Sequence, residues 1–277
     1  MSKQLFRAIA YTACCWGLVY GALWLSARQQ VHCVFIADDA SQYQPHRDLL
    51  TALHEAAAAL HIPISIRMVA PQRLERGDDR AQRLLDTADG VVMPSGFNGR
   101  GLAGKLVAAR WARENSIPYM GVCMGMQVLL IEAARNLAGL PEANSVEFDP
   151  NTRVPLIAQM DEDGEVGRVS SSLRQGYYPC TVEQGTLAYE AVATEEVEGF
   201  HSHWFECNVH LFPALEAVGV RAAGRCPEGG YVEIVELVDH PFMMGIQFHP
   251  EHDSSYEKPH PLIAAFVKKC DDRAKKH

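Results

Sequence analysis

Hydrophobic residues follow two alternating patterns between about residue 30 and residue 140. Short apolar, β-branched runs are typical of buried strands, and apolar residues spaced three or four apart are typical of helices. The pattern predicts strands at 31–39, 63–71, 90–97 and 118–123, and helices at 46–62, 76–90, 101–117 and 124–140. Because strands that alternate with helices form parallel sheets, we predict an α/β fold with helices on both faces of a mostly parallel sheet.

After about residue 149 the predicted segments become shorter and turns more frequent. The sequence predicts strands at 177–182, 221–226, 231–237 and 240–252, and a closing helix at 260–277. No internal repeat and no low-complexity linker interrupts the chain. We therefore predict that residues 30–277 form one domain and that residues 1–28 are a separate segment.

The amino-terminal segment contains no charged residue between positions 8 and 27. Twenty apolar residues in a helix span about 30 Å, the thickness of the hydrocarbon core of a bilayer. We expect a membrane anchor here. A signal peptide, a mis-assigned gene start and a buried helix stay open as alternatives.

Composition limits the classes of function. The net charge is −9, and no basic patch with interleaved aromatic residues occurs, which argues against nucleic-acid binding. The eight cysteines are scattered and form no CxxC pair, as is typical of a reducing compartment. The expected localisation is therefore a cytoplasmic catalytic domain, anchored to a membrane through residues 8–27.

A candidate nucleophile lies where the strand at 118–123 meets the helix at 124–140. Cys123 stands between Gly121 and Gly125, and small residues at these positions allow a sharp turn that exposes the thiol. The following helix N-terminus favours a thiolate. The backbone N–H groups of Met124 and of Gly96, at the end of the neighbouring strand, are candidates for an oxyanion hole.

A histidine and a carboxylate two residues apart follow the strand at 240–252. His249 is placed to accept the Cys123 proton, and Glu251 to orient the imidazole. A lone buried cysteine is usually an inert packing residue. The combination of cysteine, glycines, histidine and glutamate at strand ends favours a catalytic triad instead.

The histidines also permit a metal hypothesis, since two of them alternate along one strand. No third ligand is evident in the sequence, so neither a metal nor a cofactor is predicted. The histidines considered are His201, His203, His249, His252 and His260.

Several longer segments resemble class I glutamine amidotransferases, and more narrowly the glutaminase domain of CTP synthase. They are GRGLAGKLVAARWARENSIPYMGVCMGMQ, EAARNLAGLPEANSVEFDPNT, VEIVELVDHPF and GIQFHPEH. The likeness runs from about residue 31 to residue 269. It implies a flavodoxin-like fold and an enzyme that forms a γ-glutamyl thioester and releases ammonia.

The resemblance also implies roles for individual residues. Cys123, His249 and Glu251 match the family's triad, and Gly96 and Met124 match its oxyanion donors. Gln127 and Glu147 match residues that hold glutamine. The full set of expected substrate-binding residues is Phe97, Gln127, Glu147, Ser202 and Arg174.

Two departures from the family pattern concern the substrate. The family's R-H-R-H-R segment, in which an arginine grips the substrate carboxylate, is replaced by Phe200, Ser202 and Trp204 at the arginine positions. Losing such a contact costs on the order of 2–4 kcal/mol. The loop at 170–176 keeps Arg174 but lacks the family's leading glycines.

CTP synthases also carry an amidoligase domain with a phosphate-binding loop, and we find no such motif here. We therefore expect that this chain alone does not make CTP. Three functions stay open: an amidohydrolase acting on glutamine or another γ-glutamyl amide, a glutaminase subunit of a separate synthetase, and a catalytically degenerate regulatory domain. A homo-oligomer is equally left open.

Overall fold

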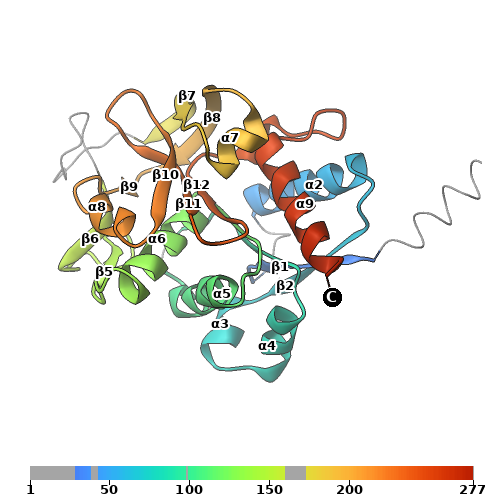
Figure 1. Ribbon diagram of the computed structural model, residues 1–277. Helices are drawn as coiled ribbons and strands as arrows, with labels where there is room; N and C mark the ends of the chain where they lie inside the picture. The colour runs from blue at the N-terminus through green and yellow to red at the C-terminus, as the bar shows by residue number, and fades with distance from the viewer. Residues whose placement is uncertain (1–28, 39–42, 98, 160–172, 277) are drawn as a thin grey trace, which may run out of the picture.

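The computed structural model describes residues 29–38, 43–97, 99–159 and 173–276 (Figure 1). Its strands are β1 (Val31–Ile36), β2 (Ile64–Val69), β3 (Gly90–Met93), β4 (Tyr119–Val122), β5 (Ala143–Ser145), β6 (Val154–Ala158), β7 (Arg174–Val182), β8 (Glu196–His203), β9 (Glu206–Cys207), β10 (Val220–Arg225), β11 (Val232–Leu237) and β12 (Met243–Ile246). Its helices are α2 (Gln44–Ala59), α3 (Pro71–Glu75), α4 (Asp79–Asp86), α5 (Leu102–Glu114), α6 (Met124–Asn136), α7 (Leu187–Val192), α8 (Phe212–Glu216) and α9 (Pro261–Ala274), with a short 3-10 helix at Pro250–Asp253.

One large sheet runs through the described residues in the order β2-β1-β3-β4-β12-β11-β10-β7-β8. The strands from β2 to β12 are parallel, and those from β12 to β8 pair antiparallel. The predicted α/β class is confirmed, as are the four parallel strands and the helices between them. The shorter segments after residue 149 supply the antiparallel half, and β5, β6 and β9 form a second, small sheet.

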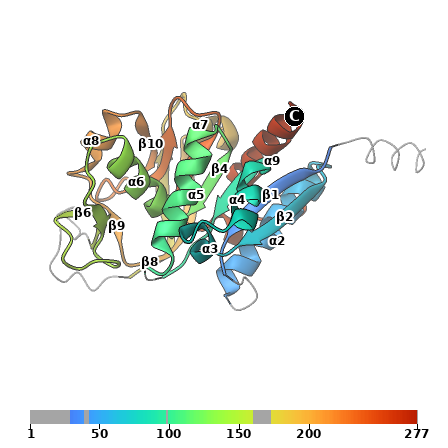
Figure 2. The ribbon, with the colours of Figure 1, turned by 90° about the horizontal axis from the view of Figure 1, so that it is seen from below.

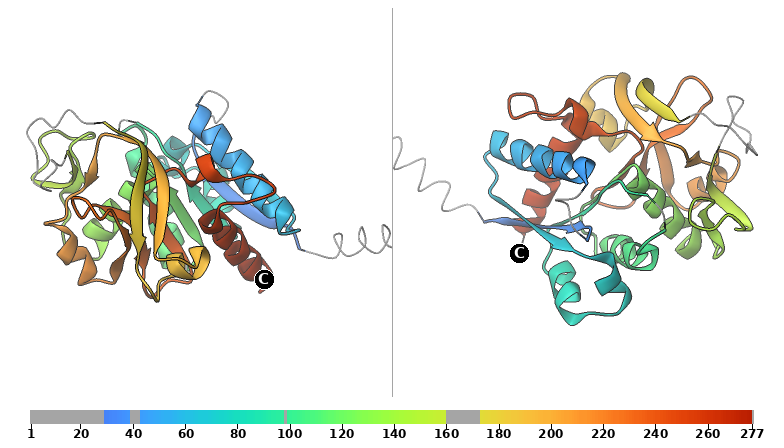
Figure 3. Two further views of the ribbon diagram at one scale, coloured as in Figure 1. Left: turned by 90° about the horizontal axis from the view of Figure 1, so that it is seen from above. Right: turned by 180° about the vertical axis from the view of Figure 1, so that it is seen from behind.

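Helices cover both faces of the parallel half. Helices α2 and α9 lie beside each other on one face (Figure 3), and α5 and α6 lie side by side on the other (Figure 2). Alternate residues of β3 accordingly enter different apolar clusters: Val91 and Met93 join the α5 and α6 side, and Val92 joins the α2 and α9 side. Burial of both faces explains why these strands are apolar throughout.

Helix α6 is held against α5 by a buried ion pair. The Arg113 guanidinium donates to Glu132 through Nε to Oε2 at 2.9 Å and through Nη2 to Oε1 at 2.8 Å. Glu132 is fully buried, and the Asn136 amide donates a further bond to it. Because a buried carboxylate without its partner is strongly destabilising, this contact fixes the position of α6.

The start of α6 also packs unusually closely on the sheet. A Cβ atom added to Gly125 would lie 2.0 Å from the carbonyl oxygen of Met93, and one added to Gly121 would lie 2.4 Å from the carbonyl oxygen of Gly125. The Tyr119 hydroxyl donates to that same Gly125 oxygen at 2.8 Å. Both glycines are therefore required by the contact between strand and helix.

The expectation of a cytoplasmic domain anchored in a membrane is contradicted. Within 29–38, 43–97, 99–159 and 173–276, no helix is long and apolar enough to cross a bilayer. The apolar segment 8–27, on which the expectation depended, lies outside those residues.

Replacing Gly125 by alanine is expected to lower the free energy of unfolding by roughly 3 kcal/mol or more, since the methyl group cannot be placed without moving the backbone of β3. Urea unfolding measures the effect. The matched control is Gly185→Ala, where φ is +75° and the added Cβ meets no described atom within 4 Å. That control loses only about 1 kcal/mol, from backbone strain alone. Equal losses in the two variants would refute the packing argument.

Candidate active site

Cys123 lies at the junction of β4 and α6 in a backbone conformation that is rare for a residue with a side chain. Its φ is 52° and its ψ is −108°. The Cys123 N–H donates to the Ile246 carbonyl at 2.7 Å, and its own carbonyl accepts from Met126 at 3.0 Å and from Gln127 at 3.3 Å. Such strain costs about 1–3 kcal/mol and persists where the surroundings impose it, which is common at functional sites.

His249 and Glu251 reach this junction because β12 pairs with β4. Ile246 lies opposite Val122 in the parallel register, and the chain leaves β12 directly beside the cysteine. The His249 N–H donates to the Phe200 carbonyl at 2.8 Å, which fixes the backbone at that point. His249 Nδ1 lies 2.7 Å from Glu251 Oε1, and both residues are buried.

The electrostatics of the pair favour a protonated imidazole. Burial alone would lower the pKa of His249, but hydrogen bonds with the Cys123 and Glu251 side chains, and the negative charge of both groups, raise that pKa to about 10. The imidazole therefore holds a proton at neutral pH and can give it to a departing group. A second contact to the sulfur comes from Gln247, whose Nε2 lies 3.8 Å from Cys123 Sγ.

A narrow cavity opens at Cys123. Its volume is about 20 Å³. Its walls come from the end of β3, the start of α6, the loop after β5 and the segment between β8 and β9. The lining residues are Gly96, Phe97, Cys123, Met124, Gln127, Glu147, His203, Trp204 and Phe205.

The sequence around this site matches that of a known protein family. The family model for glutamine amidotransferase class-I matches residues 50–269. The chain belongs to the class I glutamine amidotransferase family. Its fold and its resemblance to the glutaminase domain of CTP synthase, both predicted from the sequence, are thereby confirmed.

Two relatives show how far the likeness extends. The CTP synthase of Symbiobacterium thermophilum is 42% identical over 222 residues, which are 79% of this chain and 41% of the relative. The CTP synthase of Caldanaerobacter subterraneus subsp. tengcongensis is 41% identical over 239 residues, which are 86% of this chain and 44% of the relative. The chain thus spans less than half the length of the curated relatives it matches.

Solved structures agree with this likeness. The glutaminase domain of Trypanosoma brucei CTPS, with bound acivicin, superposes with a TM-score of 0.81 at 29% identity, covering 87% of this chain and 94% of that domain. A glutamine amidotransferase from Thermotoga maritima superposes with a TM-score of 0.50 at 13% identity, covering 80% of this chain and 76% of that one, and shows the fold alone.

The structure brings most of the expected amidotransferase residues together. Phe97, Gln127 and Glu147 line the cavity beside Cys123, as do both expected oxyanion residues. Ser202 does not line it. Along β8 the side chains alternate, so His201 and His203 are buried together on one face and Ser202 lies on the other. Arg174, also expected at the substrate, lines a neighbouring cavity instead.

Three wall residues were not among the expected substrate contacts: His203, Trp204 and Phe205. They follow one another at the end of β8, where the polypeptide turns across the cavity. His203 was noted in the sequence only as a metal ligand. Its Nε2 lies 2.9 Å from His201 Nδ1, and burial lowers the pKa of both imidazoles. In the described part of the chain, no group of three or more His, Cys, Asp and Glu residues is placed to hold a metal.

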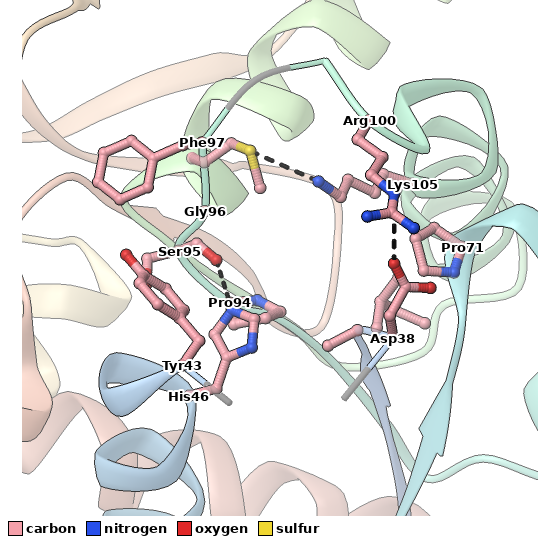
Figure 4. A pocket seen from close by; sticks show the side chains of 13 residues that line it. Asp38, Tyr43, His46, Pro71, Pro94, Ser95, Gly96, Phe97, Arg100 and Lys105 are labelled. Atoms are coloured by element: carbon pink, nitrogen blue, oxygen red, sulfur yellow. Dashed lines mark hydrogen bonds and ion pairs between the residues drawn. The ribbon is translucent and has the colours of Figure 1, made fainter. Parts of the chain in front are cut away.

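A second cavity, of about 330 Å³, shares Gly96, Phe97 and Met124 with the cavity at Cys123 (Figure 4). Lys105 projects into it from α5, and its Nζ lies 3.5 Å from Met124 Sδ. Burial lowers the pKa of Lys105 to about 8, although Asp38 and Glu147 oppose this shift. A largely buried ammonium group therefore lies close to the side chain of Met124, one of the two expected oxyanion residues.

The raised pKa of His249 predicts how stability depends on pH. The folded state holds its proton up to about pH 10, and the unfolded state only to about pH 6.5. His249 therefore contributes about 2–4 kcal/mol to the free energy of unfolding below pH 6.5. This stabilisation is lost as the pH rises toward 10. Urea unfolding of the wild type should show a steeper loss between pH 7 and pH 10 than unfolding of His249→Gln.

The control for this comparison is His54→Gln, which removes an exposed histidine on α2. Its pH dependence should follow that of the wild type. Curves that coincide for the wild type and His249→Gln would contradict the proposed charge state of the triad.

Proposed function

We propose that this chain hydrolyses the side-chain amide of glutamine or a related γ-glutamyl compound through a thioester on Cys123. The contact among Cys123, His249 and Glu251 is the observation that supports the proposal most directly. The membership in the amidotransferase family and the strained turn at the cysteine point the same way.

In the first step the Cys123 thiolate attacks the amide carbon. The carbonyl oxygen becomes an oxyanion, which the backbone N–H groups of Gly96 and Met124 would stabilise. Protonated His249 then gives its proton to the amide nitrogen as the C–N bond breaks, and ammonia leaves. The product is a γ-acyl thioester on Cys123, and His249 is now neutral.

In the second step water replaces the ammonia. Neutral His249 takes a proton from the water as the oxygen attacks the thioester, and the C–S bond breaks to restore the thiolate. Glu251 stabilises the imidazolium that forms again at Nδ1. The carboxylic acid that leaves loses its proton, which the released ammonia takes up, so one water molecule is consumed and one carboxylate and one ammonium ion are formed in each cycle.

Substitution of Cys123 by alanine is expected to reduce ammonia release from an amide substrate at least 1000-fold, because the nucleophile is lost while the cavity is kept. Coupled detection of ammonia and glutamate measures the effect. The matched control is Cys207→Ala, since Cys207 is a fully buried thiol whose pKa burial raises to about 12. Equal activity of Cys123→Ala and the wild type would refute the proposal.

A second candidate function is that of a glutaminase subunit supplying ammonia to a separate synthetase. It is supported by the relatives, which are CTP synthases. In that case the turnover of the isolated chain is low and rises at least tenfold when an amidoligase partner and its substrates are added. Turnover that is high alone and unchanged by the partner would argue against this function.

A further inference from the structure

The lining of the cavity at Cys123 has no positive charge of its own, since protonated His249 and Lys105 lie beside the cavity but are not among its described lining residues. Glu147 is the one carboxylate on the cavity wall, and neither lysine nor arginine lies among its described lining residues. His203 is neutral at pH 7, because burial lowers its pKa. Gln127 is 3% exposed, and its Oε1 has no hydrogen-bond partner among the described residues. The wall thus offers a hydrogen-bond acceptor, and no cation of its own, to the tail of a substrate.

A larger cavity of about 400 Å³ adjoins this one, and the two share His203 and Trp204 as a common wall. Trp204 is 43% exposed, so its indole is accessible to a ligand. Aromatic rings and carboxylates predominate in the larger cavity. Its lining residues are Leu173, Arg174, Tyr178, His203, Trp204, Glu206, Cys226, Glu228, Gly229 and Tyr231.

The arginine of this larger cavity is already neutralised. Arg174 Nη1 lies 2.7 Å from Glu206 and 2.9 Å from Glu233, and its guanidinium stacks 4.5 Å from the Tyr178 ring. Two carboxylates around one guanidinium leave no net positive charge to attract an anion. Burial, followed by the charge of Glu206, raises the pKa of Glu233 to about 8, so at pH 7 Glu233 is mostly neutral and Glu206 is the carboxylate that balances the charge of Arg174.

Glu206 also provides a buried carboxylate oxygen that is free to accept a hydrogen bond from a ligand. The residue is 4% exposed, and its Oε2 has no hydrogen-bond partner within the described chain. Glu228 adds an exposed carboxylate to the same cavity. A carboxylate entering here would meet like charge, whereas an ammonium group would meet acceptors and the faces of aromatic rings.

We propose that the substrate is a primary amide whose tail carries an ammonium group and no free carboxylate near the reacting end, with the tail passing Trp204 into the larger cavity. This inference rests on the proposed function, because it assigns the substrate class of the same Cys123 site. Glutamine joined through its α-carboxyl to a cationic residue has this chemistry, and free glutamine does not.

The experiment compares three amides as substrates of the full chain. They are L-glutamine, glutaminyl-lysine N-methylamide and glutaminyl-glutamate, in each of which the γ-amide is the one primary amide. We expect kcat/KM for the lysine compound to exceed that for glutamine at least tenfold, and the glutamate compound to be the poorest. Ammonia release, with Cys123→Ala as the blank, is the measurement.

A charge change at the shared wall tests the same inference independently. Trp204→Arg places a cation between the cavities, so kcat/KM should rise at least tenfold for glutamine and fall for the lysine compound. Trp204→Phe keeps an uncharged ring there, and the order of the three substrates should stay as in the wild type. Thermal unfolding of each variant verifies that it is folded.

Two outcomes overturn the inference and separate it from the proposed function. If the wild type prefers glutamine to the lysine compound, the substrate class is wrong although Cys123-dependent hydrolysis stands. If no amide is hydrolysed in a Cys123-dependent manner by the wild type or by Trp204→Arg, the proposed function fails as well.

Discussion

The parallel pairing of β12 with β4 is the contact on which the candidate site depends. It joins segments more than a hundred residues apart and sets Ile246 beside Val122. The hydrogen bond from the Cys123 N–H to the Ile246 carbonyl closes the same ladder and holds the strained turn. With that register fixed, a few further residues suffice to carry His249 to the thiol. A slip of one position would move every side chain of β12 to the other face of the sheet and would separate His249 from Cys123.

The parts of the fold that were predictable are those with a strong local pattern. The strands and helices between Val31 and Asn136 have clear apolar periods, and the predicted ranges agree with the observed elements to within a few residues. The short helices α3, α7 and α8 and the strands β5, β6, β8 and β9 were missed. All of them except β8 are small elements whose formation depends on tertiary packing more than on their own residues. The eight-residue strand β8 (Glu196–His203) was missed although it is long, and it forms by pairing with β7 along its whole length.

The residues of the candidate site also fall into those predicted from a local pattern and those that depend on tertiary structure. Cys123, His249 and Glu251 were predicted to lie together because each follows a recognisable strand, and the structure brings His249 and Glu251 to Cys123, while their catalytic roles stay a prediction. Ser202 and Arg174 were placed at the substrate by analogy, and neither lines the cavity at the cysteine. Ser202 does not line the cavity because its side chain lies on the opposite face of β8. Which face a side chain occupies depends on the register of the strand, and one sequence does not reveal that register. The ion pairs of Arg174 with Glu206 and Glu233 likewise join distant segments.

The position of β8 at the outer edge of the large sheet has a consequence for how such a site changes over time. Cys123, the proposed nucleophile, follows β4 in the middle of the sheet, where strands are bonded on both sides and a substitution disturbs many neighbours. His203 and Trp204, which we propose meet the substrate's tail, lie at the end of a strand bonded on one side only. Mutations can therefore accumulate at the rim without disturbing the reacting atoms. An enzyme built this way can acquire new substrates while its chemistry stays the same.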